Sequence, residues 1–175
     1  MPSKVYCNVE DHRLIEDIKG KKSTIEDVTK VGLPTIKHKT TTVDVAGMAM
    51  AVDVPDTTHL EASEYTIYHN NGVNGELLAV PGKHVQEFRT VRQKYGVAQG
   101  EIDHESVKYR LTGIHKETAK GDVESGSPYG STDKYSLLRY EEEVNGTVVT
   151  VIDAMAGVIK YNGKEYTDVV QNMLK

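Results

Sequence analysis

The stretch 135–153, YSLLRYEEEVNGTVVTVID, decides the fold class of this chain. Two runs with strand character, 135–144 and 147–153, flank the dipeptide Asn145-Gly146. Asn-Gly is the preferred pair for a two-residue hairpin turn, because both positions need a positive φ that these residues tolerate. The stretch therefore predicts a β-hairpin, and the sequence on either side of it extends this prediction to a mainly β protein.

Alternation of apolar and polar side chains marks another strand at 107–112. We expect Val107, Tyr109 and Leu111 to face the core, and the intervening polar residues to face away from it. Gly113 breaks the alternation, which predicts a β-bulge. Shorter strands are expected at 5–9, 65–68 and 158–161. Such a meander predicts a β-sandwich or a partly open β-barrel.

Two segments have the apolar spacing of amphipathic helices. Residues 82–95 carry apolar side chains three or four positions apart, and Gly96 follows as a stop signal. The C-terminal segment from Tyr166 has the same spacing. We therefore expect one internal helix and one C-terminal helix. The apolar residues concerned are Val85, Phe88, Val91 and Tyr95 in the first segment, and Tyr166, Val169, Val170, Met173 and Leu174 in the second.

Two further segments do not fit a compact core. Residues 117–133 contain three glycines and Pro128, which predicts a long loop. Residues 43–55 form near-mirror arms, Val-Asp-Val on each side of residues 46–51, and predict a protruding hairpin or loop. No Lys or Arg occurs from residue 40 to 82, whereas 19–39 holds six Lys. This polarity favours either head-to-tail contact between copies or two solvated charged faces.

Composition excludes several classes of protein. A chain of 175 residues fits a single domain over 1–175. A net charge of −5 argues against a dedicated nucleic-acid binder. The single cysteine, Cys7, allows no internal disulfide and is expected to be a buried, unreactive thiol in a reducing compartment. No apolar window of 18 residues and no signal-peptide core occur, so we expect no stable membrane association.

The sequence contains no recognisable catalytic, cofactor-binding or metal-binding motif, so we expect no enzyme and no cofactor. Asp103-His104-Glu105 is the best metal candidate, but neighbouring strand residues point to opposite faces, and an exposed turn is favoured. The run Glu141-Glu142-Glu143 is interpreted as an acidic strand edge that discourages unwanted strand pairing. Weaker alternatives stay open: an enzyme whose His and Glu residues converge from distant positions, or a ligand-binding module.

The order of these features carries a resemblance. Val31–Lys37 is followed by the excursion at 43–55, then by the strand with Gly113, the Asn145-Gly146 hairpin, and the closing runs Val151–Met155 and Ile159–Lys164. Over about residues 25–172 this resembles the major tail tube protein family of contractile-tailed bacteriophages, which is shared with R-type bacteriocins (tailocins).

The resemblance implies a barrel or sandwich protomer that forms hexameric rings stacked into a tube inside a contractile sheath. It implies as partners other copies of the chain, the sheath protein, the baseplate or tube initiator, and a tape-measure protein. DNA or ions would only pass through the lumen on the way across a target cell envelope. The protein would be made in the bacterial cytoplasm and become part of a phage tail or a genome-free bacteriocin; which of the two stays open.

Within this resemblance, a long hairpin reaches the adjacent ring, and segment 43–55 is the candidate. The lumen is expected to be lined from 57–69, 107–117 and 147–161. The alternatives are a core hairpin for 43–55 and, for the whole chain, a free-standing β-sandwich that binds a ligand through the 117–133 loop or its Tyr residues. The hypothesised inter-ring contacts are Val43, Asp44, Val45, Gly47, Met48, Met50, Val52 and Asp53.

Overall fold

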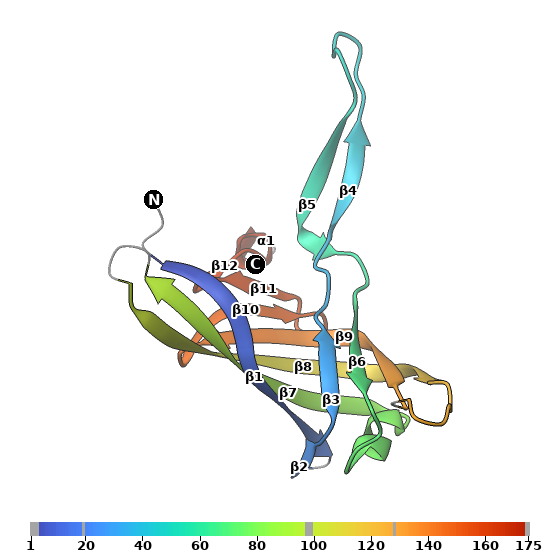
Figure 1. Ribbon diagram of the computed structural model, residues 1–175. Coiled ribbons are helices and arrows are strands. Elements are labelled where there is room, and N and C mark those ends of the chain that lie inside the picture. The colour runs from blue at the N-terminus through green and yellow to red at the C-terminus, as the bar shows by residue number, and fades with distance from the viewer. Residues whose placement is uncertain (1–3, 19, 97–99, 128, 174–175) are drawn as a thin grey trace.

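The computed structural model describes residues 4–18, 20–96, 100–127 and 129–173, and they form a mainly β protein (Figure 1). The expected fold class is confirmed, and the sheets do not close into a complete barrel. The elements are β1 (Lys4–Ile18), β2 (Lys21–Ile25), β3 (Val28–Gly32), β4 (His38–Val43), β5 (Val52–Leu60), β6 (Glu64–His69), a 3₁₀ helix η1 (Gly75–Ala79), β7 (Lys83–Gly96), β8 (Ile102–Lys120), β9 (Ser131–Val144), β10 (Thr147–Asp153), β11 (Val158–Tyr161), β12 (Lys164–Glu165) and α1 (Asp168–Met173).

One sheet contains all strands except β4 and β5. Its main path runs β12-β11-β10-β9-β8-β7-β1-β2, with neighbours antiparallel. The sheet branches at β9: residues 131–136 pair with β6, whereas residues 139–144 pair with β10. Strand β3 then pairs with β6. The β6–β3 branch crosses over the long strands and forms the second layer of the fold (Figure 1).

The core lies between these layers. It combines side chains of the long strands, such as Leu14, Phe88 and Leu111, with Tyr65 and Ile67 of β6. The expected core face of the 107–112 strand is confirmed, because Val107, Tyr109 and Leu111 are all buried. The register of β8 against β9 shifts between Thr112 and Gly113, but the unpaired residue is Leu138 of β9, so the bulge expected at Gly113 lies in the neighbouring strand.

The internal helix expected over 82–95 is wrong. This segment is strand β7, hydrogen-bonded to β1 on one side and to β8 on the other. Its apolar residues fall on both faces of the strand: Val85 and Val91 are 41% and 38% exposed, while Phe88 is buried. The buried face is otherwise polar, with His84, Gln86 and Thr90 inside. The helical spacing of the apolar residues was therefore coincidental.

Three other expectations need correction. The C-terminal helix is short, six residues that begin after Tyr166, and Leu174 and the side chains of Val169 and Val170 lie outside the described residues. The 117–133 loop is shorter than expected, because β8 continues to Lys120 and β9 begins at Ser131. The glutamate run 141–143 lies in a central strand between β8 and β10 and not at an edge.

The hairpin turn expected at Asn145-Gly146 is confirmed. Asn145 and Gly146 connect β9 to β10 with φ of 48° and 82°. Asn162-Gly163 makes an equivalent turn between β11 and the short β12, with φ of 49° and 80°. These values fit the left-handed region that two-residue hairpin turns need. Cys7 lies in β1, and its side chain is outside the described residues.

Candidate assembly surfaces

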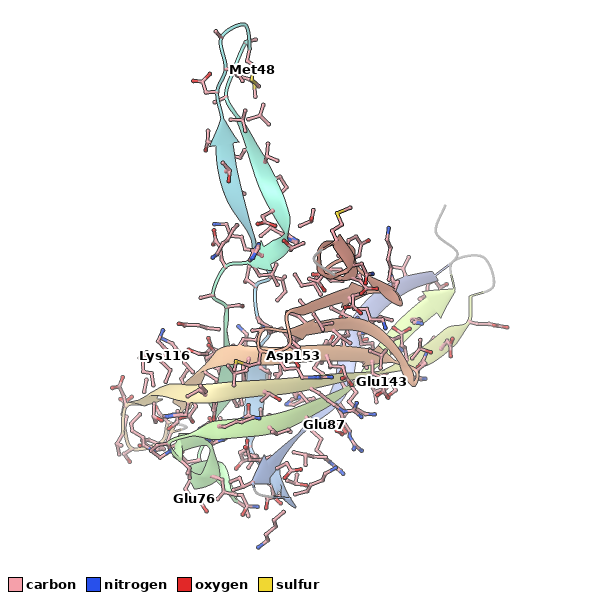
Figure 2. The ribbon with its side chains drawn as sticks, turned by 180° about the vertical axis from the view of Figure 1, so that it is seen from behind. Met48, Glu76, Glu87, Lys116, Glu143 and Asp153 are labelled. Atoms are coloured by element: carbon pink, nitrogen blue, oxygen red, sulfur yellow. The ribbon has the colours of Figure 1, made fainter. Side chains whose placement is uncertain are left out.

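Strands β4 and β5 form an arm that projects from the body of the protein (Figure 1). The two strands pair only with each other, as a separate two-stranded sheet. Met48 lies at the tip of the arm, and Glu76 at the opposite end of the molecule (Figure 2). The Met48 amide donates to the Val45 carbonyl at 3.0 Å, and Gly47 in this turn has φ of 99°. The arm is therefore an ordered hairpin with a tight tip.

The register of the arm separates its side chains into two faces. Val43 pairs with Val52, and Thr41 with Val54, so three valines share one face. Thr42 pairs with Asp53 on the opposite face, where the Thr42 hydroxyl donates to Asp53 Oδ1 at 2.6 Å. One face is apolar and the other polar. We call the first the valine face (Val43, Val52 and Val54) and the second the threonine face (Thr42 and Asp53).

All eight hypothesised contact residues lie together in this arm and are exposed. Met50, for example, is 73% exposed. Within the protomer the arm is thus not a core hairpin. Isolated apolar residues on a surface are ordinary, but six large ones gathered on one projecting element are not. The arrangement can supply an apolar contact surface to another molecule.

The root of the arm is held by polar contacts. The register of β4 and β5 shifts between His38 and Thr40, which leaves residues 56–59 as a wide bulge. Asp56 lies at the centre of this bulge and accepts hydrogen bonds from the amide and hydroxyl of Thr58, both at 2.8 Å. These bonds, together with the contact to His59, hold the pKa of Asp56 well below its usual range.

A charged ladder covers the face of β7, β8 and β9 that points away from the core. Glu87, Arg110 and Glu141 are cross-strand neighbours in one row, with Arg110 paired to both carboxylates. Lys108 contacts Glu143 at 2.7 Å in the next row. Positive and negative groups alternate and neutralise one another, so this surface carries little net charge. Figure 2 shows Glu87 and Glu143 on this side of the sheet.

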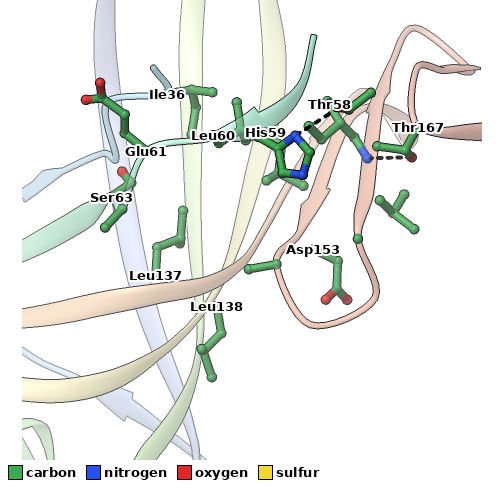
Figure 3. A pocket seen from close by; sticks show the side chains of 16 residues that line it. Ile36, Thr58, His59, Leu60, Glu61, Ser63, Leu137, Leu138, Asp153 and Thr167 are labelled. Carbon is green, nitrogen blue, oxygen red and sulfur yellow. Dashed lines mark hydrogen bonds between the residues drawn. The ribbon is translucent and has the colours of Figure 1, made fainter. Parts of the chain in front are cut away.

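An apolar groove of about 550 Å³ lies between the root of the arm and the β10–β11 hairpin (Figure 3). Leu60 lines it from β5, Leu137 and Leu138 from β9, and Ile159 from β11. The groove exists because the sheet branches at this point of β9: the Leu137 amide donates to the Ser63 carbonyl at 2.9 Å and the Ala154 amide to the Leu138 carbonyl at 2.9 Å. This groove was not among the features expected from the sequence, although the pair Leu137-Leu138 interrupts the alternation of β9 and is a signal for it.

The metal candidate at 103–105 does not converge. The three residues lie in β8, where His104 contacts Glu10 at 2.9 Å, and Glu105 is buried against Arg92 and Lys94. No group of three or more His, Cys, Asp or Glu side chains in the described part of the chain could hold a metal ion. Over the same residues, no helix has the length and apolar character needed to cross a membrane.

Comparison with known proteins gives a family. The model of the phage tail tube protein FII family matches residues 18–174. No curated protein sequence matches the chain.

Two solved assemblies contain structurally similar chains. One is the anti-feeding prophage baseplate, with 10% identity over 78% of this chain and 93% of that chain and a TM-score of 0.46. The other is the sheath–tube complex of the extracellular contractile injection system PVC in its extended state, with 13% identity over 75% and 88% and a TM-score of 0.44. Because the family model spans most of the sequence, the resemblance inferred from the residues is confirmed, and the chain belongs to the phage tail tube protein FII family.

Proposed function

We propose that this chain is the building block of the inner tube of a contractile tail, and that its copies form hexameric rings stacked along one axis. Family membership supports a structural role in a tail tube, as part of a virion or a related particle. Ring size, stacking, the surrounding sheath and contacts with a baseplate initiator and a tape-measure protein are our proposal. So are synthesis in the bacterial cytoplasm and the absence of enzymatic activity.

The observation that carries this proposal is the exposed arm. Its valines and methionines would face water in an isolated protomer, although the same residues would be stabilised by burial against a partner. A free two-stranded hairpin that carries apolar side chains and has no Lys or Arg from residue 40 onward is also an aggregation hazard, and a regular self-contact removes it. Segment 43–55 is therefore proposed as the contact to a copy in the adjacent ring.

The charged ladder suits a lumen. A passing polyanion such as DNA binds to unpaired cationic groups, but the cations of the ladder are already matched by carboxylates. Strand 107–117, which carries Lys108 and Arg110, is proposed to line the lumen together with 57–69 and 147–161. DNA or ions would pass this surface without stable binding, on the way across the envelope of a target cell.

Electron microscopy of the concentrated protein tests the proposal. We expect rings or tubes in negative stain and a concentration-dependent oligomer in sedimentation. A variant in which residues 46–51 are replaced by a Gly/Ser linker of equal length should remain folded with a cooperative melt, yet should not stack. The matched control replaces residues 122–127, an exposed loop of the same length, and should still form tubes.

Two results would contradict the proposal. One is a wild-type chain that stays monomeric at every concentration, even when tube initiator components are added. The other is a linker variant that stacks as well as the control. An unfolded or insoluble linker variant would instead show that the arm is needed for the protomer itself, against its exposure in the structure.

The apolar groove favours a second candidate function, a free-standing β-sandwich that binds a small ligand. Grooves of this volume with apolar walls and a few polar groups are typical of ligand sites. A fragment library screened by NMR would test this. Saturable shifts at Leu60 and Leu138 in a protein that remains monomeric would support the ligand-binding module over the tube.

A further inference from the structure

At the end of the protein opposite the arm, a buried histidine lies within hydrogen-bonding distance of two acceptor oxygens. His84 of β7 is 2% exposed, and its Nδ1 lies 2.8 Å from Oε1 of Glu16 in β1. Its Nε2 lies 2.6 Å from the carbonyl oxygen of Val80. A carbonyl can only accept a hydrogen bond, and a carboxylate also accepts. The contact thus needs two protons, one between each pair of heavy atoms.

The proton count makes this contact sensitive to pH. A neutral imidazole carries one N–H and could satisfy only one of the two acceptors. The second proton is supplied either by an imidazolium or by a protonated Glu16, and both descriptions contain the same number of protons. Glu16 is fully buried, and its other oxygen, Oε2, has no hydrogen-bond partner among the described residues. After loss of the shared proton, one N–H remains between two acceptors, and the charged Glu16 carboxylate binds it more strongly than the Val80 carbonyl does. Nε2 is then unprotonated and faces the Val80 carbonyl oxygen without a hydrogen bond, which is costly.

The Val80 carbonyl belongs to a segment that covers this end of the fold. Residues 70–82 carry η1, whose Leu78 is completely buried in the core. The Tyr135 hydroxyl donates to the Leu78 carbonyl at 2.6 Å, and the Asn74 side-chain amide donates to the Thr24 carbonyl at 2.9 Å. Most ties of the segment are uncharged hydrogen bonds of this kind. The Asn71 amide donates to Nδ1 of His69 at 3.2 Å, and the His84 bond to the Val80 carbonyl requires a proton on Nε2 of His84.

The groups around His84 determine the direction of its titration. From β1 it faces Glu16, from β8 His115 at 6.2 Å between ring centroids, and from β9 Tyr135 at 5.1 Å. Asp133 of β9 adds negative charge, and this residue also binds His69 of β6 at 2.8 Å. Tyr65 of β6 stacks on Tyr135. Burial opposes the charge on His84, but the hydrogen bonds to Glu16 and Val80 and the charges of Glu16 and Asp133 outweigh it, so its pKa is raised.

We propose that the Glu16–His84–Val80 contact is a proton-dependent latch that holds segment 70–82 over this end of the fold and releases it at alkaline pH. A histidine with a raised pKa in the closed state stabilises that state fully below the pKa of the open state. The stabilisation is lost as the pH rises through the closed-state pKa. Between the two values, the closing equilibrium falls about tenfold per pH unit.

Hydrogen exchange of the full chain tests the latch. After correction for intrinsic exchange rates, the protection of amides 75–84 should fall as the pH rises from mildly acidic to alkaline values. Amides 107–111 of the central strand β8 provide the internal reference, and their protection should not change over the same pH range. In Glu16→Gln, the new amide can donate to Nδ1 of a neutral His84, so all acceptors are satisfied without the extra proton. This variant should therefore keep segment 70–82 protected at alkaline pH.

The matched control is Glu76→Gln, which removes an exposed carboxylate from the segment itself and should retain the wild-type pH dependence. Constant protection of the wild type across this range overturns the latch, and so does an unchanged pH dependence in Glu16→Gln. If Glu16→Gln does not fold, His84→Gln replaces it. That side chain does not titrate, so the protection of segment 70–82 in this variant should not depend on pH, whatever its level. A wild-type pH dependence would again overturn the proposal.

Discussion

Gly113 lies directly beneath the ring of Tyr65. A Cβ at Gly113 would be 2.7 Å from Tyr65 Oη and 2.8 Å from the Ser136 carbonyl oxygen, distances that real Cβ atoms do not show. The Tyr65 ring cannot easily move away, because it is fully buried and stacked on Tyr135 at 4.9 Å between centroids. The glycine of β8 that faces the β9 bulge therefore makes room for the second layer of the fold.

Gly113→Ala should accordingly destabilise the protomer by about 1–3 kcal/mol, the usual cost of overpacking a core. Gly130→Ala is the matched control, because a Cβ at Gly130 would meet no atom within 4 Å and its φ is not positive. Chemical denaturation of both variants measures the difference. Equal free energies of unfolding for the two would show that Tyr65 yields to the new methyl group.

The two faces of β8 give a second prediction. Leu111 is completely buried, so Leu111→Ala should lower the free energy of unfolding by about 2–5 kcal/mol. Ile114 lies on the same strand beyond the bulge and is 46% exposed, so Ile114→Ala should cost less than about 1 kcal/mol. Thermal and urea unfolding of the two variants would test this. A loss below about 1 kcal/mol for Leu111→Ala would contradict the assignment of the faces.

Asp133 gives a pH-dependent prediction. This buried carboxylate receives hydrogen bonds from His69, Thr118 and His115. Burial alone would raise its pKa, but these three bonds lower it. A lowered pKa in the folded state means that the stabilisation is present above the unfolded-state pKa of about 4 and is lost as the pH falls through the folded value.

Asp133→Asn should therefore be less stable than the wild type by about 2–4 kcal/mol at neutral pH, because a charge-assisted network is broken. The difference should shrink as the pH falls from about 4, where Asp133 of the unfolded chain becomes protonated, down through the lower pKa of the folded state. Urea unfolding of both proteins at several pH values measures it. A difference that stays constant into strong acid would mean that Asp133 stabilises the fold through shape and not through charge.

Much of the fold was predictable where local patterns agree with the tertiary structure. The strand at 107–112 alternates in the sequence because one of its faces packs on the core and the other carries the charged ladder. The Asn145-Gly146 turn was predictable because its backbone needs a positive φ at both positions. The projecting segment at 43–55 was recognisable because its apolar residues show no helical spacing.

Strand β7 was not predictable in this way. Its inner face carries His84, Gln86 and Thr90, which look like surface residues in a sequence. His84 is accommodated inside by Glu16, a partner 68 residues away, and such a pairing leaves no local signal. Burial of polar groups depends on partners that only the folded chain supplies. The groove at Leu137-Leu138 was missed for a similar reason, since it depends on where the sheet branches.

The proposed tube contact yields a prediction about the two faces of the arm. If a second copy covers the valine face, Val52→Ser with Val54→Ser should raise the concentration needed for tube assembly at least about tenfold, because burial of a valine is worth about 1.5–3 kcal/mol. Thr42→Ser changes the threonine face outside segment 43–55, keeps the hydroxyl that binds Asp53, and should assemble like the wild type. Sedimentation and electron microscopy over a concentration series would measure both, with circular dichroism to confirm unchanged protomers. Normal assembly of the double serine variant, or loss of assembly in Thr42→Ser, would contradict a contact made through the valine face.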